Sequence, residues 1–260
     1  MATVLVILSG GQDSTTCLYH AKHAGHTVHA VTFDYAQRHS REIDAARKVA
    51  ALAKIASHEV VKLGPILLST SPLVSTNKLE QYSDHRSLPG GVEKTFVPLR
   101  NQLFLTIAAN RAVALKATQL WIGVSQEDFG GYPDCRQSFI TSLEEAINLG
   151  TWGQEPNHLR IVTPLMDRSK KQTVELALTL PGCYGALAWS HTGYDGAFPP
   201  TGHDHATLLR AKGFEEANVP DPLILRAVTR GLMNRPSTRN YSPDLVRSFS
   251  QRLVTEKGLG

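Results

Sequence analysis

Cysteine is scarce in this sequence, and long apolar runs are absent. The chain has three cysteines, Cys17, Cys135 and Cys183, in 260 residues. Three scattered cysteines form neither a disulfide framework nor a four-thiolate zinc site. No apolar run approaches the ~20 residues of a membrane-spanning helix, and the first residues lack the charged segment and cleavage site of a secretory signal. We therefore expect an intracellular, cytoplasmic protein that does not associate with membranes.

Charge of one sign is not concentrated in blocks either. The 27 Lys and Arg residues and the 23 Asp and Glu residues give a formal net charge of +4. No run of like charges has the form of an arm that binds nucleic acid, so we expect no direct nucleic-acid partner. With 42% apolar and 19% charged residues, the chain has the composition of a globular protein with a full core.

The stretch 3–18, TVLVILSGGQDSTTCL, organises the N-terminal part of the chain. Residues 4–8 are a continuous apolar run, which predicts a strand buried on both faces. Gly10 and Gly11 predict a tight turn, and the polar residues after them favour the start of a helix. A strand, a glycine turn and a helix start gather free backbone N–H groups around an anion. Asp13 is suitably placed to hold Mg²⁺ among phosphate oxygens.

This loop matches neither the GxxxxGK[ST] pattern nor the GxGxxG pattern of other nucleotide-binding loops. Its SGGxDS pattern resembles the pyrophosphate loop (PP loop) of the N-type ATP pyrophosphatases. Those enzymes split ATP between the α and β phosphates and pass an adenylate onward. The alternative is an ordinary glycine turn that joins a strand to a helix.

Strand and helix patterns alternate along the first 180 residues. Apolar and β-branched runs predict strands, and alanine-rich segments with apolar residues at helical spacing predict helices. This alternation predicts an α/β fold with a doubly wound parallel sheet. The predicted strands are 4–8, 27–34, 59–63, 119–124 and 160–163, and the predicted helices are 14–23, 42–55, 102–117, 137–149 and 169–180.

Other segments depart from this alternation. Residues 64–94 are rich in Ser, Pro, Thr and Asn, which predicts a long surface excursion that can act as a lid. From residue 181 onward, Gly, Pro and His replace periodic apolar residues, so this lobe is expected to bury little and to need outside support. The expected units are a core domain at 1–180, a smaller lobe at 181–214 and a helical extension at 215–260, with helices at 222–233 and 242–255.

Polar loops follow the predicted strands at their carboxyl ends, where ligands bind in open α/β sheets. Arg38, Arg100 and Lys170 are cations that could hold phosphates and a substrate carboxylate. Positioned cations also stabilise the charge that forms when a carboxylate attacks an α-phosphate. For each of these residues, the alternative is a capping or solvated loop residue.

The loop at 125–136 carries groups suited to a flat heterocycle. Phe129 and Tyr132 could stack on such a ring. Asp134 could accept hydrogen bonds from ring N–H groups, or it could be a turn residue. The loop therefore predicts one wall of a substrate site.

Six segments, in order, resemble the 7-cyano-7-deazaguanine synthase (QueC) family: SGGQDSTTCL, FDYAQRHSRE, TFVPLRNQLFL, IGVSQEDFGGYPDCRQSF, PLMDRSKKQT and LRAKGF. They run from Ser9 to Phe214, about four fifths of the chain. The resemblance implies a Rossmann-like core, of the adenine nucleotide alpha hydrolase type, that uses ATP and Mg²⁺. It also implies conversion of 7-carboxy-7-deazaguanine and ammonia to a nitrile. The carboxylate would be adenylated, aminated to an amide, activated by a second ATP and dehydrated.

The resemblance also implies a set of site residues. Those expected to bind ATP are Leu8, Ser9, Gly10, Gly11, Gln12, Asp13, Ser14, Thr15, Thr16, Cys17, Leu18 and Phe33. Those expected to carry the chemistry are Asp13, Ser14, Arg38, Arg100 and Lys170. Those expected to bind the base are Arg100, Asn101, Phe129, Tyr132 and Asp134.

The family's zinc site is the one clear departure. Members carry four zinc-binding cysteines ahead of an LRxKG segment, and none of the four positions is a cysteine here, so that site cannot form. These positions are Gly193, Thr201, Asp204 and Thr207. The nearby His191, His203, His205 and Cys183 lack a familiar zinc spacing. We expect no zinc, and a lobe held by packing or by the C-terminal extension.

Two other functions stay open at this point. A QueC-like ligase could adenylate a similar carboxylate and transfer it to another amine, such as a protein terminus. A non-catalytic nucleotide-binding partner is the third reading, although the intact loop with Asp13 argues against it. The expected partners are a small-molecule acid and ammonia, a protein acceptor in the ligase alternative, and a second copy of the chain in a homodimer.

Overall fold

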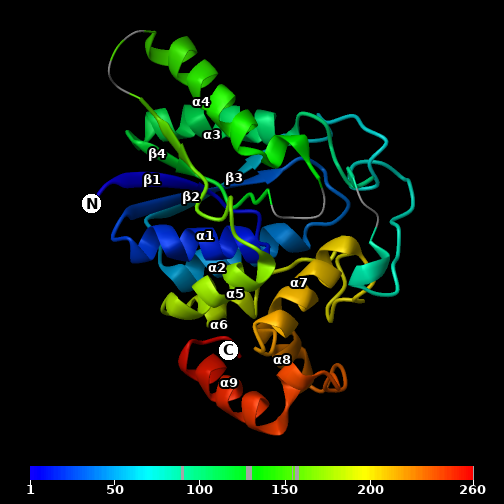
Figure 1. Cartoon of the computed structure of the whole chain (residues 1–260). Helices are drawn as coiled ribbons and strands as arrows, with labels where there is room; N and C mark the ends of the chain where they lie inside the picture. Colours follow the sequence, from blue (N-terminus) through cyan, green and yellow to red (C-terminus); the bar gives the residue numbers. More distant parts are fainter. Residues whose placement is uncertain (89–90, 127–130, 154, 156–157, 260) are drawn as a thin grey trace.

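A five-stranded parallel sheet forms the centre of the molecule (Figure 1). The computed structural model describes residues 1–88, 91–126, 131–153, 155 and 158–259. The strand order is β3-β2-β1-β4-β5, and every neighbouring pair is parallel. The predicted doubly wound α/β fold is confirmed. The strands are β1 (Thr3–Ile7), β2 (Thr27–Asp34), β3 (Ser57–Lys62), β4 (Gln119–Trp121) and β5 (Arg160–Val162).

Helices cover both faces of this sheet (Figure 1). On one face lie α3 (Arg100–Ala114) and α4 (Gln137–Trp152), which enclose a core around Leu105 and Leu120. On the other face lie α1 (Gln12–His23), α2 (Arg41–Ala53) and α5 (Lys170–Thr179), with a core around Leu18. Burial on both faces explains the continuous apolar run of β1, in which Val4 and Val6 are fully buried. Among the described helices, none is both long and apolar enough to cross a bilayer.

The strand order reverses at β1, which pairs with β2 on one side and with β4 on the other. Ligands of open α/β sheets bind at such a switch point, outside the carboxyl ends of the strands. The glycine loop after β1 therefore lies at the position that the fold makes available to a ligand.

The segment after residue 181 buries more than its composition predicts. It forms α6 (Cys183–Leu187), whose residues are all buried, and α7 (His205–Glu216). The expectation of little burial was wrong because small residues let the C-terminal helix α9 (Pro243–Thr255) approach closely. A Cβ on Gly185 would overlap the carbonyl oxygen of Glu256, and the Gly185 N–H donates to the Glu256 carboxylate (2.8 Å).

The excursion at 64–94 has little regular structure, a single 3₁₀ turn η1 (His85–Ser87) among its described residues. It lies beside α7 (Figure 1). The Tyr82 N–H donates to the carbonyl of His203 (2.8 Å), and the buried Glu93 carboxylate lies 3.8 Å from the His205 ring. The excursion is therefore docked on the lobe, and its action as a lid stays a prediction.

A buried ion pair joins the lobe to the C-terminal extension, which includes α8 (Pro222–Thr229), the 3₁₀ turn η3 (Arg239–Tyr241) and α9. The Arg210 guanidinium donates two hydrogen bonds to the Asp221 carboxylate (2.6 and 2.8 Å), and their side chains are 3% and 6% exposed. The remaining donors bond the hydroxyls of Ser190 and Thr192 (2.8 and 2.9 Å) and the carbonyl of Leu187 (3.2 Å). All the bonds of this guanidinium thus go to the segment around α6 or to the start of α8.

Replacing Arg210 with Ala should destabilise the fold strongly, because the Asp221 carboxylate stays buried without its counter-charge. We expect a loss of about 3–5 kcal/mol in the free energy of unfolding, measured by urea denaturation. The exposed Arg235 provides the control, since Arg235→Ala should change that free energy by less than about 0.5 kcal/mol. Equal stability of Arg210→Ala and the wild type would contradict the role given to the pair.

Candidate active site

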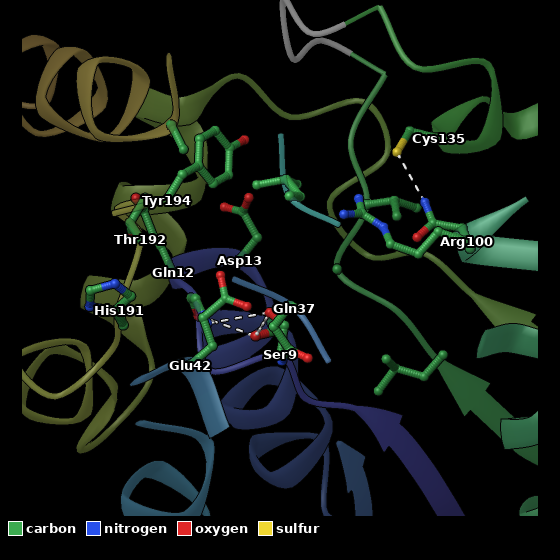
Figure 2. Close-up of a pocket in the computed structure, with 18 of the residues that line it drawn as sticks. Ser9, Gln12, Asp13, Gln37, Glu42, Arg100, Cys135, His191, Thr192 and Tyr194 are labelled. Carbon is green, nitrogen blue, oxygen red and sulfur yellow. Dashed lines mark hydrogen bonds between the residues drawn. The ribbon is translucent and has the colours of Figure 1, made fainter. Parts of the chain in front are cut away.

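A cavity of about 340 Å³ opens at the carboxyl edge of the sheet. Its walls come from the loop after β1, the end of β2, the first turns of α2 and α3, and the segment between α6 and α7. Figure 2 shows Ser9, Gln12 and Asp13 with Glu42 on one side of this cavity, and Arg100 with Cys135 on the other. Segments far apart in the sequence thus meet where the sheet topology predicts a ligand.

The glycine loop after β1 is held tightly in place. Gly10 has φ of +88°, and a Cβ there would overlap the carbonyl oxygen of Glu42 and lie 2.8 Å from the amide nitrogen of Ala46. The carbonyl of Gly10 accepts a hydrogen bond from the His191 N–H (2.8 Å). Only glycine combines this backbone conformation with so close an approach of α2.

Polar atoms of the loop and of the first turn of α1 lack partners in the protein. The Ser9 and Ser14 hydroxyls bond each other (2.9 Å) beside the cavity. Gln12 Nε2, Asp13 Oδ1 and Thr15 Oγ1 are buried and have no hydrogen-bond partner. Leaving buried polar groups unpaired costs about 1–3 kcal/mol each. Gln12 and Asp13 line the cavity. The amide donor of Gln12 suits phosphate oxygens, and the carboxylate oxygen of Asp13 suits Mg²⁺.

Asp13 is paired at its other oxygen. Its Oδ2 lies 2.6 Å from Lys170 Nζ, with side-chain exposures of 26% and 16%. Lys170 opens α5, so the contact joins the starts of two helices on the same face of the sheet. The arrangement presents one cation and one free carboxylate oxygen to whatever enters the cavity.

The opposite wall is built around Arg100. This residue opens α3, and Tyr35, Tyr132 and Tyr194 line the same cavity. The Tyr132 hydroxyl also bonds the Thr95 hydroxyl (2.6 Å). A guanidinium in a cavity that is also lined by aromatic rings suits a planar anionic molecule, because the rings can pack on the faces of that molecule while the guanidinium pairs with its charge.

Most of the predicted site residues line this cavity. These are Leu8, Ser9, Gly11, Gln12, Asp13, Ser14, Phe33, Arg38, Arg100, Asn101, Tyr132 and Lys170. The Arg38 guanidinium also donates hydrogen bonds to the carbonyls of Pro72 and Asn77 in the excursion (3.4 and 3.1 Å).

Other predicted residues lie behind the cavity wall. Gly10, Thr15, Thr16, Cys17 and Leu18 are buried, and burial raises the pKa of the Cys17 thiol, so this group stays neutral. Asp134 is also buried and accepts a hydrogen bond from the backbone N–H of Asn101 (3.4 Å). Phe129 lies outside the described residues.

Several lining residues were not selected from the sequence, among them Glu42, His191 and Tyr194. His191 Nε2 bonds the carbonyl of Gly193 (2.7 Å), and burial lowers the pKa of His191 to about 4, so the ring is neutral. Glu42 follows His39 by three residues, and the loop that contains His39 was predicted to lie at this edge of the sheet. This position was the only sequence signal that could have pointed to Glu42. Nothing local in the sequence distinguishes it from an ordinary first-turn glutamate.

Comparison with known proteins identifies the family. A family model described as queuosine biosynthesis protein QueC matches residues 3–218. The chain belongs to the QueC family. A 7-cyano-7-deazaguanine synthase from Gloeobacter violaceus is 49% identical over 86% of this chain and 96% of its own length. Synthases of the same name from Chromobacterium violaceum and Laribacter hongkongensis are 47% and 46% identical, over 85% of this chain and 93% and 94% of their own.

Three of the four positions that the sequence assigned to the zinc site of the QueC family, Gly193, Asp204 and Thr207, lie close together. A Cβ on Gly193 would lie 3.5 Å from both Asp204 Oδ2 and the Thr207 methyl group. Thr201 donates to the Asp195 carboxylate (2.8 Å), and Asp204 Oδ1 caps α7 by accepting the Thr207 N–H (2.9 Å). One glycine, two threonines and a capping aspartate do not make a zinc donor set. Across the described residues, no group of three or more His, Cys, Asp or Glu side chains is arranged to hold a metal ion.

Alanine at Gly10 should displace the loop, because a methyl group there collides with the backbone of α2. Gly25 is the matched control, since it has φ of +80° but no atom within 4 Å of an added Cβ. Gly25→Ala should cost about 1–2 kcal/mol of unfolding free energy from backbone strain alone, and Gly10→Ala about 1–3 kcal/mol more. Urea unfolding of the two variants measures the difference. Equal losses would contradict the close approach of α2.

Proposed function

We propose that this chain is an ATP-dependent 7-cyano-7-deazaguanine synthase. The observation that carries the proposal is the convergence of the PP loop and Arg100 on one cavity at the switch point of the sheet. Relatives that carry this name align over nearly their full length. Their similarity favours the nitrile synthase over the ligase and the non-catalytic partner.

In this proposal the PP loop holds the triphosphate of ATP. The backbone N–H groups at the start of α1 and the Ser9 and Ser14 hydroxyls donate to phosphate oxygens, and Lys170 neutralises charge. The unpaired Oδ1 of Asp13 would hold Mg²⁺. When bound, Mg²⁺ would neutralise the triphosphate and stabilise the leaving pyrophosphate.

Arg100 and the rings around it would bind 7-carboxy-7-deazaguanine. Tyr132 packs on the heterocycle, and Asn101 lies beside it at the cavity wall. Attack of the substrate carboxylate on the α-phosphate gives an acyl adenylate and pyrophosphate. Ammonia converts the adenylate to an amide, and a second ATP activates the amide oxygen so that loss of AMP leaves the nitrile. The chain's contribution to each step is alignment of the reactants and stabilisation of charge on the phosphate oxygens.

We further propose that the lobe works without zinc and that the protein acts in the cytoplasm on small molecules. Glycine, two threonines and a capping aspartate at the four family positions support the first statement. The C-terminal extension, which contacts α6 through Glu256 and Arg210 through Asp221, would take over the supporting role. A homodimer stays a prediction.

Incubation with ATP, 7-carboxy-7-deazaguanine and ammonium, followed by mass spectrometry, tests the proposed function. A nitrile product is expected. An adenylate or amide without nitrile would favour the ligase alternative, and no pyrophosphate release with this acid would favour the non-catalytic alternative.

Asp13→Ala should lower the rate of pyrophosphate release at least about 100-fold, because the metal ligand and the partner of Lys170 are both lost. The measurement is a pyrophosphate assay, with circular dichroism to verify that the variant folds. Asp244, an exposed carboxylate in α9, is the control, and Asp244→Ala should keep the wild-type rate. A wild-type rate in Asp13→Ala would refute the assignment.

Metal content tests the proposal on zinc. Elemental analysis of the purified protein should give less than about one zinc per chain, and a chelator should leave the melting temperature unchanged. Structural zinc normally contributes folding free energy, so a fall in melting temperature together with stoichiometric zinc would overturn the proposal.

A further inference from the structure

Glu42 is fixed beside the PP loop by its own backbone. The residue lies in the first turn of α2, and its carbonyl oxygen occupies the space that a Cβ on Gly10 would need. Its side chain lines the cavity. In Figure 2 it lies close to Ser9 and Gln12, on the side of the cavity opposite Arg100. The Glu42 side chain therefore lines the cavity beside the loop that would hold the phosphates of ATP.

The other acidic groups near this place already have partners. Asp13 pairs with Lys170 (2.6 Å), and Asp134 accepts the N–H of Asn101 behind the wall. Within the described part of the chain, the Glu42 carboxyl has neither a hydrogen bond nor an ion pair, and its side chain lines the cavity.

Burial dominates the electrostatics of this group. It raises the pKa of the Glu42 carboxyl to about 7, and the positive charge of Arg100 partly opposes the increase. Neutral His191 and the half-buried His39, whose pKa is also lowered by burial, add little positive charge at neutral pH. Titratable and charged groups from every surrounding segment line the same cavity: Asp13, Tyr35, Arg38, His39, Arg100, Tyr132, Cys135, Lys170, His191, Tyr194, His205 and Arg210.

A carboxylate so close to bound phosphates would be repelled unless a cation lies against it. Mg²⁺ and ammonium are the two cations that the proposed reaction brings to the cavity. In the proposed function, the unpaired Oδ1 of Asp13 already binds Mg²⁺. Ammonium suits Glu42, because the cation must lose a proton before its nitrogen can attack an acyl carbon.

We propose, building on the proposed function, that Glu42 binds ammonium and acts as the base that releases ammonia for amide formation. One proton passes from ammonium to the Glu42 carboxylate, which gives ammonia and a carboxylic acid. The nitrogen lone pair forms the C–N bond to the acyl carbon, and the C–O bond to AMP breaks with its electron pair on AMP. The nitrogen loses its surplus proton to water, and Glu42 returns its proton to solvent before the next turnover.

Glu42→Gln tests this inference, since it keeps the shape of the side chain but cannot accept the proton. Without ammonium, the variant should form acyl adenylate and pyrophosphate at the wild-type rate. With limiting ammonium at about pH 7, the rate of amide formation should fall by about 10²-fold or more. At about pH 9, where more of the ammonium is already neutral, the difference from the wild type should shrink at least about 10-fold. Mass spectrometry of adenylate and amide gives all these rates.

Asp44→Asn, an exposed carboxylate two residues further along α2, is the matched control and should follow the wild type at both pH values. Three results would overturn the inference: loss of adenylate formation in Glu42→Gln, an unchanged amide rate at about pH 7, or a defect of equal size at the two pH values. A wild type that releases no pyrophosphate would instead remove the proposed function and this inference with it. If the wild type makes nitrile and the Glu42→Gln variant behaves like the wild type, only the role of Glu42 is refuted and the proposed function stands.

Discussion

The site depends on the close packing of α2 and the lobe against the backbone of Gly10. α2 presses on one side of this residue through the Glu42 carbonyl, and the His191 N–H bonds the Gly10 carbonyl from the lobe. The PP loop is therefore part of a three-way junction of β1, α2 and the lobe. Any shift of α2 or of the segment around His191 would change the orientation of the N–H groups that face the phosphates. A site that depends on such preorganised donors loses much of its effect when they move by a fraction of an ångström.

Arg210 connects this junction to the C-terminal extension. It bonds Ser190 and Thr192, the two neighbours of His191, and it takes its counter-charge from Asp221. The family match ends at residue 218, so Asp221 belongs to the part of the chain that the family model does not describe. The C-terminal extension thereby acts on the PP loop through one buried side chain. Burying a guanidinium costs several kcal/mol unless its donors are satisfied, which explains why so many bonds converge on it.

Local signals were enough to predict the sheet and most of the cavity, and the missed features depend on tertiary contacts. Apolar runs and glycine turns mark β1 and β2 because their cause lies within a few residues. The burial of α6 has its cause at Gly185, where α9 arrives from about 70 residues further along the chain. Asp134 faces the start of α3 because a 3₁₀ turn at Pro133–Cys135 directs it there. For Glu42 the only local signal is its position three residues after His39, since the crossing of α2 over the loop is what places it in the cavity.

At the positions that correspond to the zinc cysteines of the family, the hydrogen bonds do not connect distant parts of the lobe as a zinc ion would. Thr201 bonds Asp195 six residues away, and Thr207 bonds Asp204 three residues away, so both contacts are local. A zinc ion would instead tie residue 193 to residue 207. Here the ties that reach far along the chain come from outside the lobe. His39 bonds the Gly193 carbonyl (3.1 Å), and Tyr82 bonds that of His203. The lobe is thus fixed by the segments that also form the cavity, so its stability and the shape of the site are set by the same contacts.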